Sequence, residues 1–210
     1  ALKYHQKATS HIESWYGFHS SFIAARYFPE KQLDEALRSR FDYLFGLLHD
    51  RTKMVPLYHA SRIQNTSGTI GLLVDKYEAY GDVEDLKKAS RLADWLMNTW
   101  QRKDGAYVNH NTVYTSVIYV AKSMLELTLV ERELGKTESM WKEAAGRHYA
   151  SAKRAIDQLV ASQGDFETEG ELTFEDGMVS CSALQIGMLA LMQQDEKERK
   201  HYTDAMLQIL

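Results

Sequence analysis

Apolar side chains recur every three or four residues along most of this 210-residue chain. This is the spacing that places apolar residues on one face of an α-helix. The chain holds only 2 Pro and 12 Gly, so few positions would interrupt such helices. The pattern therefore predicts an all-α protein. Its expected helices cover Ser14–Phe28, Glu30–Asp50, Thr66–Gly81, Asp82–Gln101, Val113–Gly135, Thr137–Ser162, Asp176–Asp195 and Glu196–Leu210.

The predicted helices are of two kinds that alternate along the chain. One kind is rich in Gly, Ser and Ala and apolar on most faces, which is typical of inner helices packed on several sides. The other kind is amphipathic and charged, which is typical of outer helices with one face in water. The charged segments are Glu84–Trp100, Glu138–Leu159 and Glu196–Leu210.

The connections alternate as well. Those from inner to outer helices are short and lie near Asp82, Lys136 and Asp195. The connections back to inner helices are long and end in polar and aromatic clusters; they cover His49–Asn65, Arg102–Tyr114 and Gln163–Gly177. The second and third also share a Gln, a Gly and Asp in either order, an aromatic residue and a following small-residue helix. Helical hairpins therefore repeat about every 50 to 60 residues.

Repeated helical hairpins form either an open α-solenoid or a closed α/α toroid. Because the long connections all fall on one edge, we favour the toroid, whose loops build a single site. We expect residues 1–210 to form one α/α-toroid domain, or an incomplete arc of one, within a longer chain. Further hairpins would then come from additional residues or from a partner chain.

Two segments carry a resemblance to a known group of proteins: "QRKDGAYVNHNTVY" (Gln101–Tyr114) and "QGDFETEGELTFEDGMVSCSAL" (Gln163–Leu184). Together with the hairpin pattern, they resemble the six-hairpin superfamily of carbohydrate-active enzymes. That group holds glycoside hydrolases, unsaturated uronyl hydrolases and polysaccharide lyases of the α/α-toroid type. The resemblance implies an extracellular or periplasmic protein that acts on a neutral or anionic oligo- or polysaccharide. A fold by itself does not determine which reaction is catalysed.

The first of these segments is rich in neutral hydrogen-bonding groups, and its candidate site residues are Asn109, His110, Asn111 and Tyr114. If the inner helix begins near Asn111, His110 and Tyr114 share one helical face. Neutral donors can stabilise the enolate-like intermediate of β-elimination from a uronic acid, and Tyr or His can move the proton. The resemblance implies that Asn109 and His110 neutralise the carboxylate and that Tyr114 is the acid/base.

Two questions about this segment stay open. His110 lies between two Asn, whereas the familiar order of such lyases is Asn-Asn-His, so either His110 or Tyr114 could be the proton-transfer residue. A capped helix start is the structural alternative, with Tyr114 packed against Trp100.

The second segment supplies carboxylates for a hydrolase. A glycosidase needs two carboxylates beside the scissile bond, and Glu175 or Asp176 is the best acid candidate. Its partner could be Glu169, Glu171 or a residue of further hairpins. The alternatives are that Asp176 caps a helix, or that Glu175 orients a lyase residue or binds sugar hydroxyls.

Further candidate substrate-binding residues lie in "PLYHASRIQNTSG" and at the start of the first inner helix. They are Tyr58, His59, Arg62, Asn65 and Trp15. Arg62 is suited to a bidentate grip on a carboxylate, His59 to acid/base chemistry, and Trp15 to stacking on a sugar ring. Core packing or plain exposure is the alternative for each.

Several function classes are disfavoured. The net charge of −4 supplies no basic excess for a nucleic acid. No apolar run reaches the roughly 20 residues that span a bilayer. Metal-ligand spacings and phosphate loops are absent from the sequence, so we expect no metal and no cofactor. A non-catalytic helical-repeat binding module remains the alternative outside enzymes.

Overall fold

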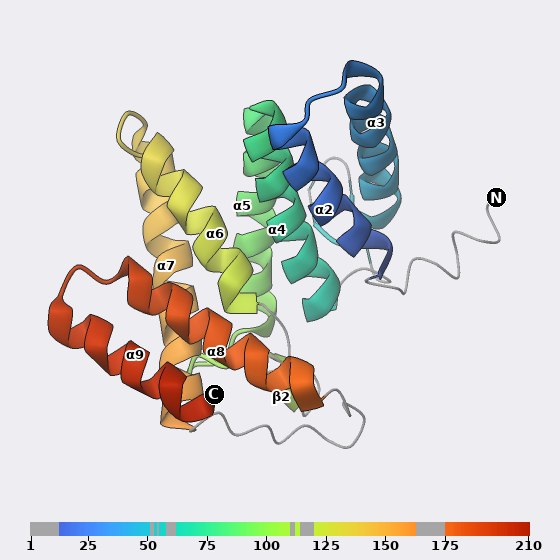
Figure 1. The fold of residues 1–210 in the computed structure, drawn as a ribbon. Helices are drawn as coiled ribbons and strands as arrows, with labels where there is room; N and C mark the ends of the chain where they lie inside the picture. Colours follow the sequence, from blue (N-terminus) through green and yellow to red (C-terminus); the bar gives the residue numbers. More distant parts are fainter. Residues whose placement is uncertain are drawn as a thin grey trace. The chain divides into compact units, whose positions relative to one another are not determined.

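The computed structural model describes residues 13–50, 53, 55–57, 62–109, 112–113, 120–162 and 175–210. Nearly all of these residues lie in α-helices (Figure 1), which confirms the all-α prediction. The helices are α2 (Glu13–Tyr27), α3 (Lys31–Leu48), α4 (Ile63–Tyr80), α5 (Val83–Trp100), α6 (Val120–Leu134), α7 (Ser139–Ala161), α8 (Glu175–Met192) and α9 (Glu196–Ile209). Two short strands, β1 (Val108–Asn109) and β2 (Thr112–Val113), lie between α5 and α6.

The helices follow one another as hairpins, α2/α3, α4/α5, α6/α7 and α8/α9, each with a short connection. Longer connections lie between the hairpins, so the predicted alternation is confirmed. Local caps explain where the short turns fall. Gly81 ends α4 in the left-handed region at φ 73°, which costs glycine little. The next residue, Asp82, accepts a hydrogen bond from the Glu84 amide at 3.0 Å and so caps α5.

The chain divides into two compact units, Ala1–Trp95 and Leu96–Leu210, and each is described by itself. The core of the first unit is aromatic. The ring of Phe41 lies edge-on to those of Phe18 and Phe22, with centroids 5.5 Å apart in both cases. Phe22 also meets Tyr80 of α4. These separations are those of favourable aromatic pairs, and they join α2, α3 and α4.

An ion cluster around the buried Lys76 and Asp85 joins three helices of the first unit. The Lys76 ammonium of α4 lies 2.8 Å from Asp42 of α3 and 2.9 Å from Asp85 of α5. Asp85 is fully buried and also binds Lys88 at 3.0 Å. Because buried charges are tolerated only when they are paired, this cluster fixes how α3 and α5 lie against α4.

In the second unit, α6 packs along α7, and α8 contacts both of them. The α6/α7 interface buries Met124, Leu125, Trp141 and Ile156. A charged pair, Glu131 of α6 and His148 of α7, lies inside this apolar layer. The carboxylate oxygen and the imidazole Nδ1 are 2.7 Å apart, and both side chains are fully buried.

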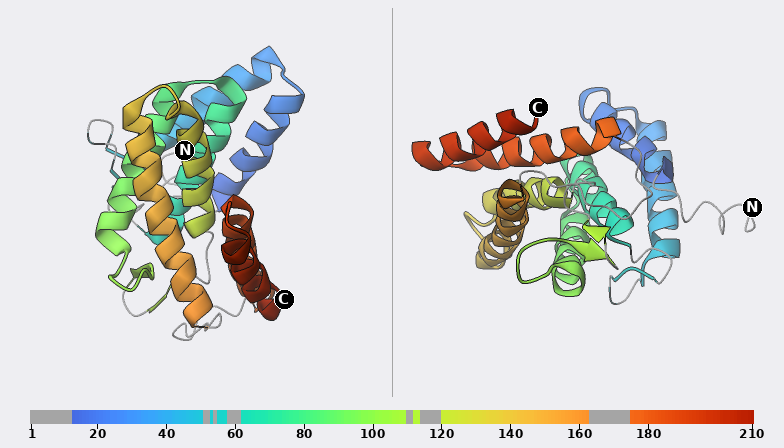
Figure 2. Two further views of the ribbon diagram at one scale, coloured as in Figure 1. Left: turned by 90° about the vertical axis from the view of Figure 1, so that its left-hand side faces the viewer. Right: turned by 90° about the horizontal axis from the view of Figure 1, so that it is seen from below.

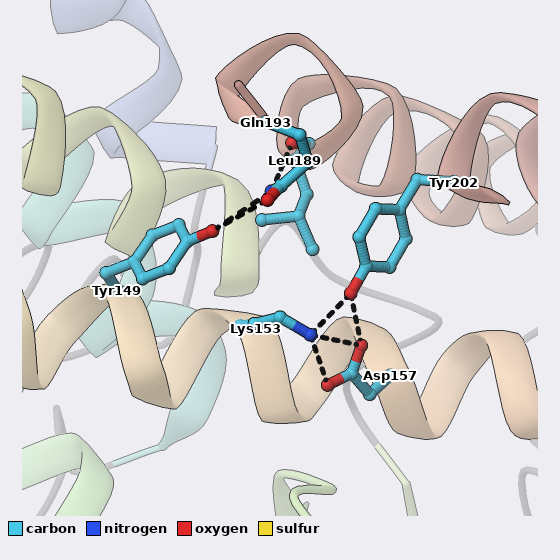
Figure 3. A network of polar contacts seen from close by, with 6 residues as sticks. All are labelled: Tyr149, Lys153, Asp157, Leu189, Gln193 and Tyr202. Carbon is cyan, nitrogen blue, oxygen red and sulfur yellow. Dashed lines mark hydrogen bonds and ion pairs between the residues drawn. The ribbon is translucent and has the colours of Figure 1, made fainter. Parts of the chain in front are cut away.

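Polar contacts attach the last hairpin to α7 (Figure 3). Tyr149 hydrogen-bonds with the Gln193 side chain, which also donates to the Leu189 carbonyl. Lys153 and Asp157 follow Tyr149 on the same side of α7. Lys153 donates a hydrogen bond to the Tyr202 hydroxyl, and this hydroxyl donates one to Asp157, both at 2.6 Å. Burial and the neighbouring Asp157 raise the pKa of Tyr202 to about 12, so this hydroxyl remains a donor at neutral pH.

Burial separates inner from outer helices only in part. Along α4 every residue from Ile63 to Val74 is buried or half-buried, whereas α5 and α7 bury one face each. Two inner helices depart from the prediction: α2 exposes Ile23 and Tyr27 at 44% and 69%, and α8 exposes Leu184 and Leu191 at 42% and 84%. Within the described ranges, none of the helices is long and apolar enough to cross a membrane.

Candidate functional site

The connection from α5 to α6 begins with a tightly closed turn. Gln101 forms an isolated antiparallel bridge with Tyr107. Inside it, the Arg102 amide donates to the Ala106 carbonyl at 2.9 Å and the Gly105 amide to the Arg102 carbonyl at 3.0 Å. This turn is therefore a defined structure at the base of the segment that holds the predicted lyase residues.

The Gln101 side chain fastens this turn to α7. Its amide nitrogen donates to the carbonyls of Gly105 and Ser151, both at 2.9 Å. Its amide oxygen accepts from the Ser151 hydroxyl and the Arg154 guanidinium, both at 2.8 Å. All of its hydrogen-bonding groups are thus used in joining the turn to α7.

Tyr107 provides a second attachment to α7. Its side chain is fully buried, and its hydroxyl lies 2.6 Å from the Ser151 hydroxyl. Burial raises the pKa of Tyr107 to about 12, although the Ser151 hydrogen bond and the Arg154 charge oppose the rise. The hydroxyl is therefore protonated at neutral pH and acts as an anchor.

Gly105 permits the close approach of the turn to α7. Its φ is 99°, a conformation that residues with a side chain rarely adopt. A Cβ atom at this position would lie 2.3 Å from the Arg154 carbonyl oxygen. Glycine is thus required here both for the backbone angle and for the contact.

The charged residues of the turn also have local roles. The Asp104 carboxylate accepts from the Arg102 guanidinium at 2.5 Å and from the Ala106 amide at 3.1 Å. The hydrogen bond with Arg102 lowers the pKa of Asp104 below its ordinary value. The first half of the "QRKDGAYVNHNTVY" segment therefore builds and anchors a turn.

The second half of the segment continues as a short antiparallel ladder. Val108 pairs with Val113 and Asn109 with Thr112. The expectation that a helix begins near Asn111 is wrong at Thr112 and Val113, which are strand residues and are β-branched, as strands prefer. The shared helical face of His110 and Tyr114 thus loses its basis. His110, Asn111 and Tyr114 themselves, and the side chain of Asn109, lie outside the described part of the chain.

The first long connection also begins with a turn closed by an antiparallel bridge. The sequences of the loops did not indicate this likeness. His49 forms an antiparallel bridge with Pro56, beside hydrogen bonds from Asp50 to Val55 at 2.9 Å and from Leu57 to Leu48 at 2.8 Å. The two turns share no residue pattern. What they share is a backbone bridge that closes the chain just after an outer helix. This supports the hairpin repeat.

Other predicted binding residues are placed at helix starts. Arg62 is exposed and precedes α4, and its carbonyl accepts from the Thr66 amide and hydroxyl. Asn65 lies in the first turn of α4 and is only 5% exposed. Trp15 lies in the first turn of α2, but its side chain is outside the described part, as are Tyr58 and His59 entirely. No contact therefore brings these residues together within the part that is described.

The two candidate carboxylates begin α8. Glu175 is its first residue and Asp176 its second. Both residues belong to the first turn, where the helix dipole favours negative charge. Their side chains are not described, and neither are Glu169 and Glu171.

Gln185 is a supporting residue that no pattern in the sequence singles out. It is fully buried in α8, and its side-chain oxygen accepts from the Ala121 amide at 2.8 Å. Ala121 is the second residue of α6, whose first amides have no partner within the helix. The start of α6, which follows the site segment along the chain, is thereby tied to α8.

In the described residues, no group of three or more His, Cys, Asp or Glu side chains could hold a metal ion. Comparison of the chain with models of known protein families gives no match. Comparison with curated protein sequences likewise gives none. The function is therefore inferred from the residues and geometry of this chain.

Proposed function

We propose that this chain is a carbohydrate-active enzyme of the six-hairpin type that cleaves a uronic-acid-containing glycan by β-elimination. Its hairpins would form an α/α toroid or an arc of one, in an extracellular or periplasmic protein. The observation that carries the proposal is the anchored turn at Gln101–Tyr107, which leads directly into Asn109, His110, Asn111 and Tyr114.

The anchored turn matters because catalysis depends on position. A displacement of about 1 Å can cost roughly 100-fold in rate. Gln101, Gly105 and Tyr107 fix the turn to α7 by hydrogen bonds and close packing, and Gln185 fixes the start of α6. The segment between these anchors is therefore held at both ends, which suits residues that must meet a substrate in one orientation.

The chemistry follows from the neutral groups of the segment. Asn109 and His110 would donate hydrogen bonds to the uronate carboxylate and stabilise the negative charge that develops when the C5 proton leaves. Tyr114 or His110 would accept that proton, and the C4–O bond would break as the C4–C5 double bond forms. Protonation of the departing oxygen, by Tyr114 in the simplest case, completes the elimination.

The remaining predicted residues would bind the sugar. Arg62 is exposed at the start of α4, where a guanidinium can grip a second carboxylate. Asn65 is buried, which favours a supporting role for it. Tyr58, His59, Asn111 and Trp15 would contact neighbouring sugar units, with stacking on Trp15.

Hydrolysis is the second candidate. Glu175 and Asp176 occupy the first turn of an inner helix in the same unit as the anchored turn, a position where a carboxylate could protonate a glycosidic oxygen. Their partner carboxylate would have to come from Glu169, Glu171 or another chain segment. The elimination mechanism needs no such partner, and for this reason we place it first.

A substrate screen separates these possibilities. The protein is incubated with polygalacturonate, alginate and a glucuronate-containing glycosaminoglycan, with dextran as the uncharged control. Elimination produces new chain ends that absorb in the near ultraviolet, so absorbance and reducing ends should rise together on one uronate polymer. Reducing ends without absorbance would establish hydrolysis and refute elimination. Tight binding without any product would favour the helical-repeat binding module.

A further inference from the structure

The anchored turn and α7 together carry an excess of positive charge. The turn, Gln101–Tyr107, contains two basic residues and one acidic residue. Helix α7 contains four basic and two acidic residues, His148 apart, whereas the whole chain has a net charge of −4. In the left view of Figure 2 the turn lies beside the C-terminal half of α7. Basic residues therefore gather where these two segments meet.

The acidic residues of this region, Asp104 and Asp157, are already paired. Asp104 of the turn binds Arg102 at 2.5 Å. On α7, Asp157 binds Lys153 at 3.0 Å and accepts a hydrogen bond from the Tyr202 hydroxyl. Both carboxylates are thus engaged with their own partners and leave the other cations of the region without a counter-charge.

Lys103 and Arg154 are the exposed cations left over at this place. The turn touches α7 at Gly105, which packs against the Arg154 backbone. Lys103 precedes Gly105 by two residues, so their Cα atoms are at most about 7 Å apart. Neither Lys103 nor Arg154 forms an ion pair within the described ranges. Two uncompensated positive charges therefore lie where the turn meets α7, directly before the segment with the predicted lyase residues.

The Arg154 guanidinium is held in position without being neutralised. Its Nη2 donates to the Gln101 side-chain oxygen at 2.8 Å. In the part of the chain that the structure describes, its other N–H groups form no hydrogen bond. The charge also acts on the interior, where it opposes the rise in the pKa of Tyr107. Arg154 is therefore an oriented cation with donors left to grip a carboxylate.

A further basic residue extends the same side of α7. Arg147 is exposed and precedes Arg154 by seven residues. This separation is close to two helical turns, so the two residues share one face of the helix about 10 Å apart along its axis. A row of cations with this spacing suits a polymer with repeated negative charges better than a single small anion.

We propose that Lys103 and Arg154, extended by Arg147, form a subsite that binds carboxylates of a uronic-acid polymer outside the reacting sugar unit. The choice of ligand rests on the proposed function, because the turn leads directly into Asn109 and His110. The neutral groups of that segment would bind the reacting sugar, and the cations would hold the sugar units that follow it. Such a subsite accounts for the local excess of basic residues in a chain that is acidic overall.

Direct binding measurements test this subsite without requiring turnover. Polygalacturonate, alginate and the glucuronate-containing glycosaminoglycan are each titrated into the protein by calorimetry, at low and at physiological salt. On the polymer that binds most tightly, Lys103→Gln and Arg154→Gln should each weaken binding about 3- to 5-fold, and both together about 10- to 20-fold. The loss should shrink at the higher salt because exposed charges are screened. If the polymer is degraded, its KM should rise by a similar factor.

The matched control is Lys197→Gln. It removes the same charge from an exposed position on α9 and should bind as the wild type does. Arg154→Lys keeps the charge and should retain most of the affinity. Because Arg154→Gln also loses the bond to Gln101, urea denaturation checks its folding. Lys103→Gln breaks no contact in the described part of the chain, so its result stands even if Arg154→Gln is unstable.

The outcomes separate this subsite from the proposed reaction. A variant with both substitutions that binds as tightly as the wild type overturns the subsite, even if the wild type degrades the polymer. A wild type that binds none of the three polymers, or binds a DNA duplex as tightly as the best of them, also overturns it. Binding that depends on Lys103 and Arg154 without any product supports the subsite and refutes the elimination reaction.

Discussion

Replacing Gly105 by Ala tests whether the anchored turn is as tightly fitted as its geometry indicates. Two costs add. An L-residue at φ 99° is strained by about 1–2 kcal/mol. The new Cβ would also lie 2.3 Å from the Arg154 carbonyl oxygen, so the turn must retreat from α7 by about 1 Å to restore ordinary contact.

That retreat breaks specific interactions. The hydrogen bond from Gln101 to the Gly105 carbonyl and the one between Tyr107 and Ser151 each contribute about 1 kcal/mol. Gly105→Ala should therefore lower the free energy of unfolding by about 3–4 kcal/mol. The measurement is urea denaturation followed by circular dichroism, with linear extrapolation to water.

Gly81→Ala is the matched control. Gly81 also has a positive φ, 73°, but a Cβ there meets no atom within 4 Å, so only the backbone strain of about 1–2 kcal/mol applies. Equal destabilisation by the two substitutions would refute the close fit of the turn to α7. If the turn also positions catalytic residues, Gly105→Ala should reduce turnover about 100-fold.

Three further predictions concern buried polar groups. The raised pKa of Tyr107, about 12, means that folding favours its protonated form; stability should fall by about 1.4 kcal/mol per pH unit from pH 10 to 12. Tyr107→Phe should remove this contribution to the decline in unfolding free energy, as measured by urea titration at each pH. A variant whose unfolding free energy falls with pH as steeply as that of the wild type would contradict it. His148→Ala leaves the buried Glu131 without its imidazole and should cost about 3–5 kcal/mol, largely recovered when Glu131→Leu is added; a cost under about 1 kcal/mol by calorimetry would argue against the pair. Lys76→Met should cost less, about 2 kcal/mol, because Asp85 keeps Lys88, and a larger thermal shift than that of His148→Ala would refute this ranking.

The helices could be predicted because their evidence is local. Apolar spacing, the scarcity of Pro, and caps such as Gly81, Asp82 and Asp195 lie within a few residues of the elements that they define. The start of α6 was mispredicted because Thr112 and Val113 fit an apolar pattern of either period. They form a strand because they pair with Val108 and Asn109, a contact that the apolar pattern does not reveal.

The anchors of the site could not be predicted for a different reason. Gln101 and Tyr107 lie in a segment that the sequence singled out, but their partner Ser151 lies more than 40 residues away. Gln185 is 64 residues from Ala121. Long-range contacts of this kind leave no periodic trace in a single sequence. The sequence therefore located a polar segment, and the structure identified its first half as an anchor.

The proposed function requires the segment after this anchor to move a proton in an elimination reaction. The most direct test is the initial rate of near-ultraviolet absorbance rise on a uronate polymer, measured for the wild type and for Tyr114→Phe. We expect a rise in absorbance for the wild type and a rate at least about 100-fold lower for Tyr114→Phe, with an unchanged unfolding midpoint. A wild type that produces no absorbance on any uronate polymer, or a variant as fast as the wild type, would contradict it.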